Sequence, residues 1–193
     1  MINLGCVDIN PWTSRTQNPN EPDHIVIDLD PSDNDFTKVI ETARAAKQYV
    51  DQQKIKAFIK TSGKSGIHML LPCSKLSFTE ARTIATFICD EIHALVPKIS
   101  TTEISVGLRG RKLYIDPNQN DYADTIAAAY SARPNTIPTV SAPLEWREVN
   151  SKLHPSQFTI RSILQRIERK GDLFRGLMDK KIITANTKIL RGL

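Results

Sequence analysis

The chain has 193 residues, of which 40% are hydrophobic and 24% are charged, and its formal net charge at pH 7 is +5. These values fit one soluble globular domain with its own core and leave too few residues for two domains of ordinary size. We expect no membrane-spanning segment and no signal peptide, because no apolar run approaches ~20 residues and the first residues lack a basic region followed by an apolar core. The three cysteines include no Cys-x-x-Cys pair, which argues against a zinc site or a disulfide framework.

The apolar pattern predicts strands that alternate with helices. In chain order we expect a strand at residues 2–9, a loop, a strand at 25–29, a helix at 36–53, strands at 57–60 and 67–72, a helix at 78–95, strands at 113–115 and 127–130, and a helix at 158–170. This order predicts an α+β fold, with one mostly antiparallel sheet backed by two long helices.

We expect a single domain over residues 1–193, with an N-terminal strand and loop at residues 1–24 and a basic helical tail at residues 151–193. The tail holds ten Lys and Arg against three acidic residues, a net charge of +7, so the rest of the chain is near −2. A basic segment beside a carboxylate site suits a polyanionic substrate. A solvated helix face explains the same charge equally well.

Two aspartates lie two residues apart at the end of the apolar strand expected at residues 25–29. Because side chains alternate between the two faces of a strand, Asp28 and Asp30 point to the same side. A third aspartate, Asp116, directly follows the apolar strand expected at residues 113–115. Neighbouring carboxylates repel one another unless a cation lies between them, and hard divalent ions prefer oxygen ligands. A carboxylate trio that holds two ions roughly 3.5–4 Å apart is typical of nucleotidyl transfer.

The first pair of aspartates also has a structural interpretation. Aspartate at the end of a strand often forms a turn or caps a helix, and residues 30–33 have the composition of a turn before the helix expected near residue 35. The pair alone therefore leaves both interpretations open.

Residues 60–68 read Lys-Thr-Ser-Gly-Lys-Ser-Gly-Ile-His and form the expected turn between two strands. Glycines allow backbone N–H groups to approach a phosphate closely, the first serine adds a hydroxyl donor and either lysine adds charge. The residues that could bind an anion here are Lys60, Ser62, Gly63, Lys64, Gly66 and His68. An ordinary hairpin with a basic tip explains them too, and this is no Walker loop, because an apolar strand follows rather than a helix.

A basic cluster at residues 109–112 precedes the strand that ends in Asp116. Such a cluster can hold triphosphate oxygens or the backbone of a template strand. Asn120 and Arg133 add polar groups that could line the same cleft. The ordinary alternatives are a surface arginine for Arg109, a turn former for Asn120 and a loop residue before proline for Arg133.

Taken in order, these motifs resemble the polymerase domain of bacterial ligase D, a member of the archaeo-eukaryotic primase superfamily that serves non-homologous end joining. The segments that carry the resemblance are residues 22–31 (Pro-Asp-His-Ile-Val-Ile-Asp-Leu-Asp-Pro), 60–68, 114–120 with Asp116 and Asn120, 130–133 (Tyr-Ser-Ala-Arg) and 143–149 (Pro-Leu-Glu-Trp-Arg-Glu-Val). The resemblance spans nearly the whole chain and implies the palm-like fold of primase-polymerases.

The resemblance also implies roles for the matching residues. Asp28, Asp30 and Asp116 would be the catalytic residues and would bind two Mg²⁺ or Mn²⁺ ions. The implied nucleotide site consists of Ser62, Gly63, Lys64, His68, Arg109 and Arg133. The implied reaction is the attack of a primer 3′-hydroxyl on the α-phosphorus of a nucleotide, which fills gaps or extends ends in double-strand break repair.

The partners that the resemblance implies are DNA ends or gapped DNA, ribo- or deoxyribonucleoside triphosphates, a DNA ligase domain or protein, and a Ku-like end-binding protein. It implies no membrane partner and a cytoplasmic location at the nucleoid. Domains of this family have about a hundred further residues before the point where this chain begins, with an aromatic that stacks on the base pair and lysines that bind a 5′-phosphate. We therefore expect a shortened polymerase domain. The open alternatives are a catalytically impaired DNA-binding or partner-binding module and, less favoured, a nuclease or phosphatase.

Overall fold

The computed structural model describes residues 5–33 and 35–193. Its centre is a six-stranded sheet in the order β10-β4-β5-β3-β7-β6. These strands are β3 (His24–Pro31), β4 (Phe58–Thr61), β5 (Ile67–Pro72), β6 (Ser100–Thr101), β7 (Leu113–Asp116) and β10 (Pro143–Leu144). Every neighbouring pair is antiparallel except β6 with β7. The expected α+β fold with a mostly antiparallel sheet is therefore confirmed.

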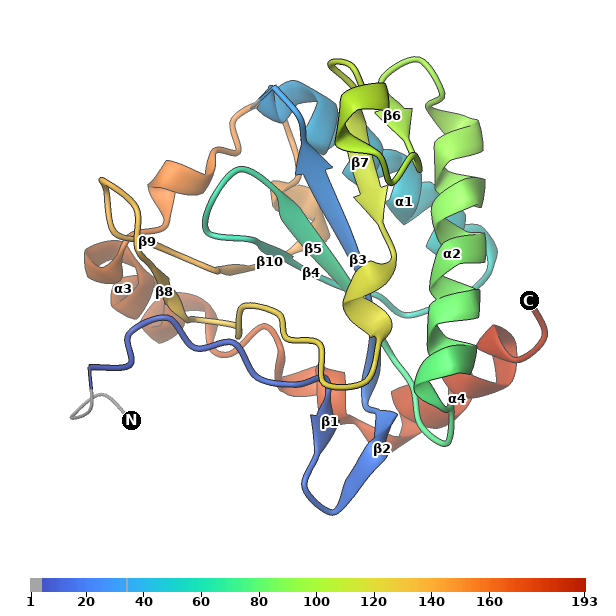
Figure 1. Cartoon of the computed structure of the whole chain (residues 1–193). Helices are drawn as coiled ribbons and strands as arrows, with labels where there is room; N and C mark the ends of the chain where they lie inside the picture. The colour runs from blue at the N-terminus through green and yellow to red at the C-terminus, as the bar shows by residue number, and fades with distance from the viewer. Residues whose placement is uncertain (1–4, 34) are drawn as a thin grey trace.

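Two long helices pack against each other and against the central strand β3, with α1 behind the sheet and α2 along its edge in Figure 1. Helix α1 (Phe36–Gln52) begins where the side chain of Asp35 accepts a hydrogen bond from the backbone N–H of Thr37. Helix α2 (Phe78–Leu95) begins with a capping box between Ser77 and Glu80. Their buried stripes were visible in the sequence, and include Val39, Ala43, Ala46, Val50, Ala81, Ala85, Ile88 and Ile92.

The remaining elements extend this core at its edges. They are β1 (Ser14–Arg15), β2 (Asn18–Pro22), β8 (Ala132–Arg133), β9 (Thr139–Val140), α3 (Ile160–Lys170) and α4 (Lys180–Leu190), with short 3₁₀ turns between them. Helix α3 has the side chain of Thr159 as its N-cap and Gly171 at its C-cap, where φ is 70°. Among the described helices, none combines the length and the apolar character that crossing a membrane requires.

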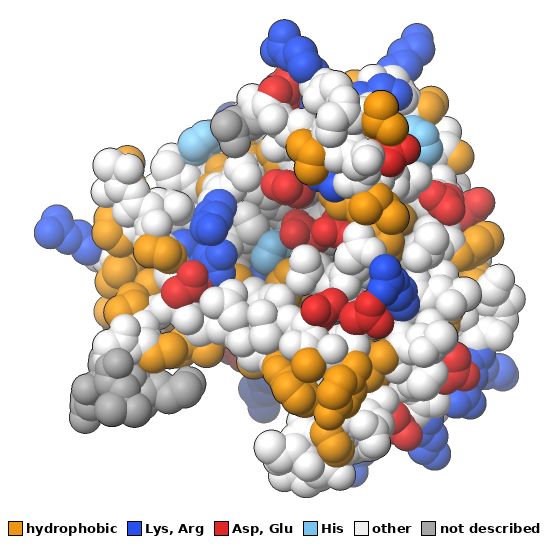
Figure 2. All heavy atoms as spheres, viewed as in Figure 1, with side chains coloured by type: hydrophobic (Ala, Val, Ile, Leu, Met, Phe, Trp, Pro, Cys, Tyr) orange, Lys and Arg blue, Asp and Glu red, His pale blue; other side chains and the backbone are white. Residues whose placement is uncertain are grey.

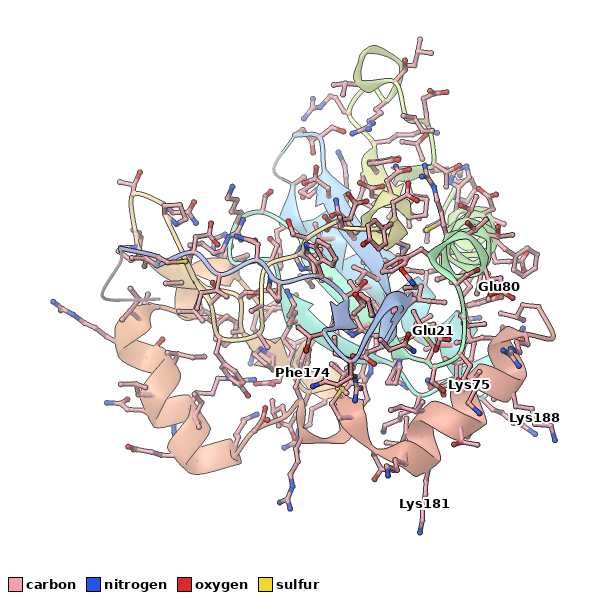
Figure 3. The ribbon with its side chains drawn as sticks, turned by 60° about the horizontal axis from the view of Figure 1, so that its bottom comes forward. Glu21, Lys75, Glu80, Phe174, Lys181 and Lys188 are labelled. Carbon is pink, nitrogen blue, oxygen red and sulfur yellow. The ribbon has the colours of Figure 1, made fainter. Side chains whose placement is uncertain are left out.

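Helix α4, which forms the C-terminal part of the basic tail, does not lie beside the turn at residues 62–66. The side chain of Asn186 on α4 bonds both backbone groups of Lys56, and Thr187 accepts from the N–H of Ser74, so α4 lies at the other end of β4 and β5. Figure 3 shows Lys181 and Lys188 pointing from α4 away from the body of the protein. The charge of α4 is therefore that of a solvated helix face, the alternative that the sequence left open.

Two expected strands are wrong. Residues 5–9 form no strand, and residues 2–4 of that prediction lie outside the described part of the chain. The backbone of Ile9 instead donates to the hydroxyl of Ser131 and accepts from the N–H of Ala128, which ties this segment to a loop. Residues 127–130 form no strand either, because Tyr130 adopts a φ of 66° and turns the chain.

Asn120 supports the sheet rather than lining a cleft. Its side chain is 1% exposed, and it bonds the N–H of Val26 at 2.8 Å and the carbonyl of Val26 at 2.7 Å. It also donates to the carbonyl of Pro117 at 2.6 Å. The amide thus replaces a strand neighbour at the point where β7 no longer accompanies β3, and it satisfies backbone groups that would otherwise be buried without partners.

Replacing Asn120 by alanine should therefore destabilise the fold by about 3 kcal/mol, because both backbone groups of Val26 lose their partner. Urea denaturation followed by circular dichroism measures this loss. Asn18→Ala, in the exposed hairpin strand β2, is the matched control and should change the free energy of unfolding by less than about 0.5 kcal/mol. Equal midpoints for the two variants would contradict this role of Asn120.

Candidate active site

Four polar side chains form one row across the sheet, from β4 to β7. Lys60 pairs with His68, His68 with Asp28, and Asp28 with Asp116 in the strand register. Residues that pair across antiparallel strands point to the same face. Asp30, two residues beyond Asp28, shares that face because side chains alternate along a strand. The structure therefore brings the three predicted aspartates and the predicted histidine to one face, and Figure 2 shows acidic, histidine and basic side chains around a hollow there.

The carboxylates of this row repel one another. Burial raises the pKa of Asp28 to about 8, and the negative charges of Asp30 and Asp116 act in the same direction. Lys60 and Arg133 oppose the shift but do not cancel it. A bound cation would remove the repulsion, because it favours the ionised form of every carboxyl group around it.

The donor set suits a hard divalent ion, although the ligands are not gathered around one point. In residues 5–33 and 35–193, no group of three or more His, Cys, Asp or Glu side chains is close enough to hold a metal ion. The Oδ1 atom of Asp116 already accepts from the backbone N–H of Asn118 at 2.7 Å and from its amide at 2.6 Å. Asn118 thus bonds Oδ1 of Asp116 and not the second carboxylate oxygen.

Lys60 is a member of the row that sequence reasoning treated only as a basic residue near the turn. Its side chain is 1% exposed, and its ammonium lies 2.6 Å from Nδ1 of His68 and 2.7 Å from Oγ of Ser141. Burial lowers the pKa of Lys60 to about 7. Burial and the charges of Lys60 and Arg133 hold the pKa of His68 well below its usual range, so the imidazole is neutral.

The clue to Lys60 in the sequence is its place at the end of an apolar strand, where a lysine is rarely fully buried without a role. The other nitrogen of His68, Nε2, lies 3.5 Å from Oδ1 of Asp28. Lys60, His68 and Asp28 are thus in contact from one strand to the next. A group that binds at Oδ1 of Asp28 would therefore lie beside the imidazole of His68.

The turn between β4 and β5 is built around Ser62 and two glycines. The hydroxyl oxygen of Ser62 accepts from the N–H groups of Lys64 at 3.1 Å and Gly66 at 3.0 Å, so the hydroxyl hydrogen is left to donate outward. Gly66 packs so closely on β3 that a Cβ atom would lie 2.4 Å from the carbonyl oxygen of Leu29. Gly63 has a φ of +77°, and a Cβ atom there would lie 2.4 Å from Cγ of Arg133. Both glycines are thus required by close contacts beside Asp28 and Arg133.

The three predicted basic residues take different positions. Arg133 is held by Asp8 and Asn10 of the N-terminal segment and lies over Gly63. Arg109 stacks on the ring of Tyr114 at 3.6 Å and donates to the carbonyls of Glu103 and Ile104. Lys64 is exposed at the tip of the turn. It lines a pocket of about 380 Å³ together with Phe36, Ser65, Asn135, His154 and Pro155.

The sequence of the chain decides its family. Residues 1–174 match the family model described as "LigD, primase-polymerase domain". The chain belongs to this family.

Relatives of the LigD family are similar over most of this chain. The bifunctional non-homologous end joining protein LigD of Bacillus subtilis is 37% identical over 175 residues, which cover 87% of this chain and 29% of that protein. The multifunctional non-homologous end joining DNA repair protein LigD of Mycobacterium tuberculosis is 32% identical over 162 residues, 83% of this chain and 21% of that protein. The chain therefore spans less than a third of the length of these relatives.

A solved structure shares the fold. It is the polymerase domain from Mycobacterium tuberculosis ligase D in complex with DNA, with a TM-score of 0.76 and 30% sequence identity. The match covers 82% of this chain and 56% of that chain. The expected resemblance to the ligase D polymerase domain is confirmed in both sequence and fold.

Replacing Asp28 by asparagine should stabilise the metal-free protein. Because the pKa of Asp28 rises from 3.8 to about 8 on folding, the folded protein holds a proton that the unfolded chain releases, and stability falls as the pH rises from about 4 to about 8. The variant escapes this loss because its amide is neutral. We expect it to melt at least roughly 4 °C above the wild type near pH 9, and close to the wild type near pH 4.

Thermal unfolding in the presence of a chelator measures this difference. Asp90→Asn, an exposed aspartate on α2, is the matched control and should not change the melting temperature at either pH. A melting temperature for Asp28→Asn at or below that of the wild type near pH 9 would show that repulsion at the row is not significant.

Proposed function

We propose that this chain transfers nucleotides to DNA by a metal-dependent primase-polymerase reaction in non-homologous end joining. The observation that carries the proposal is the row across the sheet, in which carboxylates on β3 and β7 adjoin neutral His68 and the glycine-containing turn. Family membership supports the reaction class, because the matching model describes a primase-polymerase domain. The substrate is a ribo- or deoxyribonucleoside triphosphate.

The acidic and basic halves of the row would take different parts of the reaction. Asp28, Asp30 and Asp116 would hold two Mg²⁺ or Mn²⁺ ions, which lower the pKa of a primer 3′-hydroxyl and neutralise charge on pyrophosphate when bound. Asn118 bonds only Oδ1 of Asp116, so it does not occupy the second oxygen of that carboxylate. Asp28 would give up its proton on binding, so affinity for the ions should increase with pH up to about 8.

The groups that would bind the triphosphate lie toward β4 and β5, except for Arg109, which stacks on Tyr114 of β7. The Ser62 hydroxyl, the backbone N–H groups near Gly63 and the Lys64 ammonium belong to the turn. His68 and Arg133 adjoin it, and Arg109 lies near enough to Asp30 to oppose the rise in the pKa of that carboxyl. These groups donate hydrogen bonds and none of them is negatively charged, which suits the negatively charged oxygens of a triphosphate.

The nucleic-acid partner would be gapped DNA or DNA ends, as is consistent with the DNA complex of the Mycobacterium tuberculosis domain. A DNA ligase domain or protein and a Ku-like end-binding protein would supply the other steps of joining. We place this activity in the cytoplasm, at the nucleoid, where those substrates occur.

One observation favours the alternative of a catalytically impaired binding module. In the described residues the carboxylates do not surround a common point, so a bound ion requires side-chain rotation. Such a module would bind DNA with the usual salt dependence even without the aspartates. Primer extension separates the two functions, because only the polymerase needs the carboxylates.

The test is extension of a gapped, 5′-phosphorylated DNA by the purified chain with Mn²⁺ and each nucleotide. We expect Asp116→Ala and Asp28→Ala to lower the extension rate by at least about a hundredfold, because the developing charge loses its metal ligands. Asp90→Asn should extend at the wild-type rate. Retained extension in the two alanine variants would refute the proposal.

Binding of Mn²⁺, followed by electron paramagnetic resonance, distinguishes the remaining outcomes. Wild-type protein that binds Mn²⁺ and DNA but does not extend the primer would identify the binding module. Release of inorganic phosphate or cleaved DNA would identify a nuclease or phosphatase instead.

A further inference from the structure

The N-terminal segment holds the guanidinium of Arg133 by one nitrogen. Nη1 of Arg133 donates to Oδ1 of Asp8 at 2.8 Å and to Oδ1 of Asn10 at 2.9 Å. The amide of Asn10 in turn donates to Oδ1 of Asp8 at 3.0 Å. The three side chains therefore form a closed set of hydrogen bonds, which we call the Arg133 clamp, between residues more than 120 positions apart in the chain.

The clamp leaves the opposite edge of the guanidinium without a partner. Nε of Arg133 is buried and has no hydrogen-bond partner among the described residues. The side chain as a whole is only 13% exposed. A buried N–H without an acceptor is unfavourable, and the edge formed by Nε and Nη2 is the one that binds two oxygens of a carboxylate or phosphate at once. The Nε–Nη2 edge can thus donate two hydrogen bonds to an anion.

The free edge belongs to the proposed phosphate side of the site. The Cγ atom of Arg133 lies where a Cβ atom of Gly63 would be, so the arginine runs directly over the turn. Its charge also lowers the pKa of Lys60 and His68 and opposes the rise in the pKa of Asp28. Arg133 is therefore close both to the turn and to the row that contains Asp28.

The side chains of Asp8 and Asn10 are not needed to attach their own segment. The backbone of Ile9 donates to Oγ of Ser131 at 2.7 Å and accepts from the N–H of Ala128 at 2.9 Å. The carbonyl of Pro11 accepts from the N–H of Ile126 at 3.2 Å. These backbone bonds keep the segment in place when a side chain of the clamp is removed, so the clamp side chains are free to serve Arg133.

We infer that Asp8 and Asn10 are positioning residues that present the Nε–Nη2 edge of Arg133 to a phosphate group of the incoming nucleotide. This inference rests on the proposed function, because it takes the triphosphate as the ligand of Arg133. A long side chain that is held in advance loses less rotamer freedom on binding, so the clamp increases affinity for the anion without touching it. Asp8 at the same time balances the charge of Arg133 beside Lys60 before the nucleotide arrives.

Calorimetric binding of inorganic tripolyphosphate at low salt, without divalent ions, tests the clamp apart from the metal site. We expect Arg133→Ala to abolish binding, and Asp8→Ala and Asn10→Ala each to weaken it about fivefold, equivalent to about 1 kcal/mol. Asp8→Glu should restore most of the affinity, because it keeps a carboxylate acceptor. Asp51→Ala is the matched control, because it removes the carboxylate of the surface ion pair with Lys47. It should bind tripolyphosphate with wild-type affinity.

Kinetics and melting exclude a merely structural role. In primer extension the clamp variants should raise the KM for the nucleotide about fivefold and keep kcat within about twofold of the wild type. Their melting temperatures should match that of Asp51→Ala. If Asp8→Ala and Asn10→Ala bind tripolyphosphate as tightly as the wild type while Arg133→Ala does not, the inference is wrong and the proposed function stands. If Arg133→Ala binds as tightly as the wild type, the phosphate role of Arg133 fails, and the clamp fails with it.

Discussion

The strand register of the central sheet is the constraint on which the site depends. Because β4, β5, β3 and β7 pair in their observed register, Lys60, His68, Asp28 and Asp116 share one row and one face. A shift of one residue in any strand would move its polar side chain into the core and an apolar one into the hollow. The row itself is unfavourable, since it buries a lysine and brings carboxylates together. The apolar face of the same strands must therefore supply the stability that keeps the row assembled.

The fold meets this demand on both sides of β3. Leu29, which alternates with the aspartates, is fully buried in the core that α1 and α2 cover. The backbone of β3 is fixed as well. Asn120 satisfies the N–H and carbonyl groups of Val26 where β7 ends, and Gly66 lets the turn pack directly on the carbonyl of Leu29. The strand that carries two of the aspartates is thus fixed along its length by contacts that involve neither carboxylate.

Local patterns in the sequence predicted the long helices, the buried strands and the shared face of Asp28 and Asp30, because alternation and helical period depend on neighbouring residues only. The contact of Lys60 with His68 and the structural role of Asn120 could not be predicted. Each depends on a partner from another strand, His68 through the register and Val26 through a side-chain bond. The clamp on Arg133 was missed for the same reason. The two wrong strands, at residues 2–9 and 127–130, have apolar residues in a strand-like pattern. In the described residues they are joined by one backbone bond, between Ala128 and Ile9, and by the nearby Ser131 hydroxyl rather than by a ladder.

The register also separates the site into two halves of opposite character. Neighbouring strands lie roughly 4.8 Å apart, so Lys60 and Asp116 are about 14 Å apart at the backbone across three steps of the sheet. Apart from Arg109, which stacks on Tyr114 of β7, the donor groups lie at and beside β4 and β5, and the carboxylates lie on β3 and β7. A ligand that is anionic itself and brings cations with it, such as a nucleoside triphosphate with two divalent ions, would fit this order, with its phosphates toward the turn and its ions toward Asp116. A simple anion would not interact favourably with the carboxylates. A lone cation would not interact favourably with Lys60, His68 and Arg133. The two halves together support the proposal of nucleotidyl transfer over a site for either ion alone.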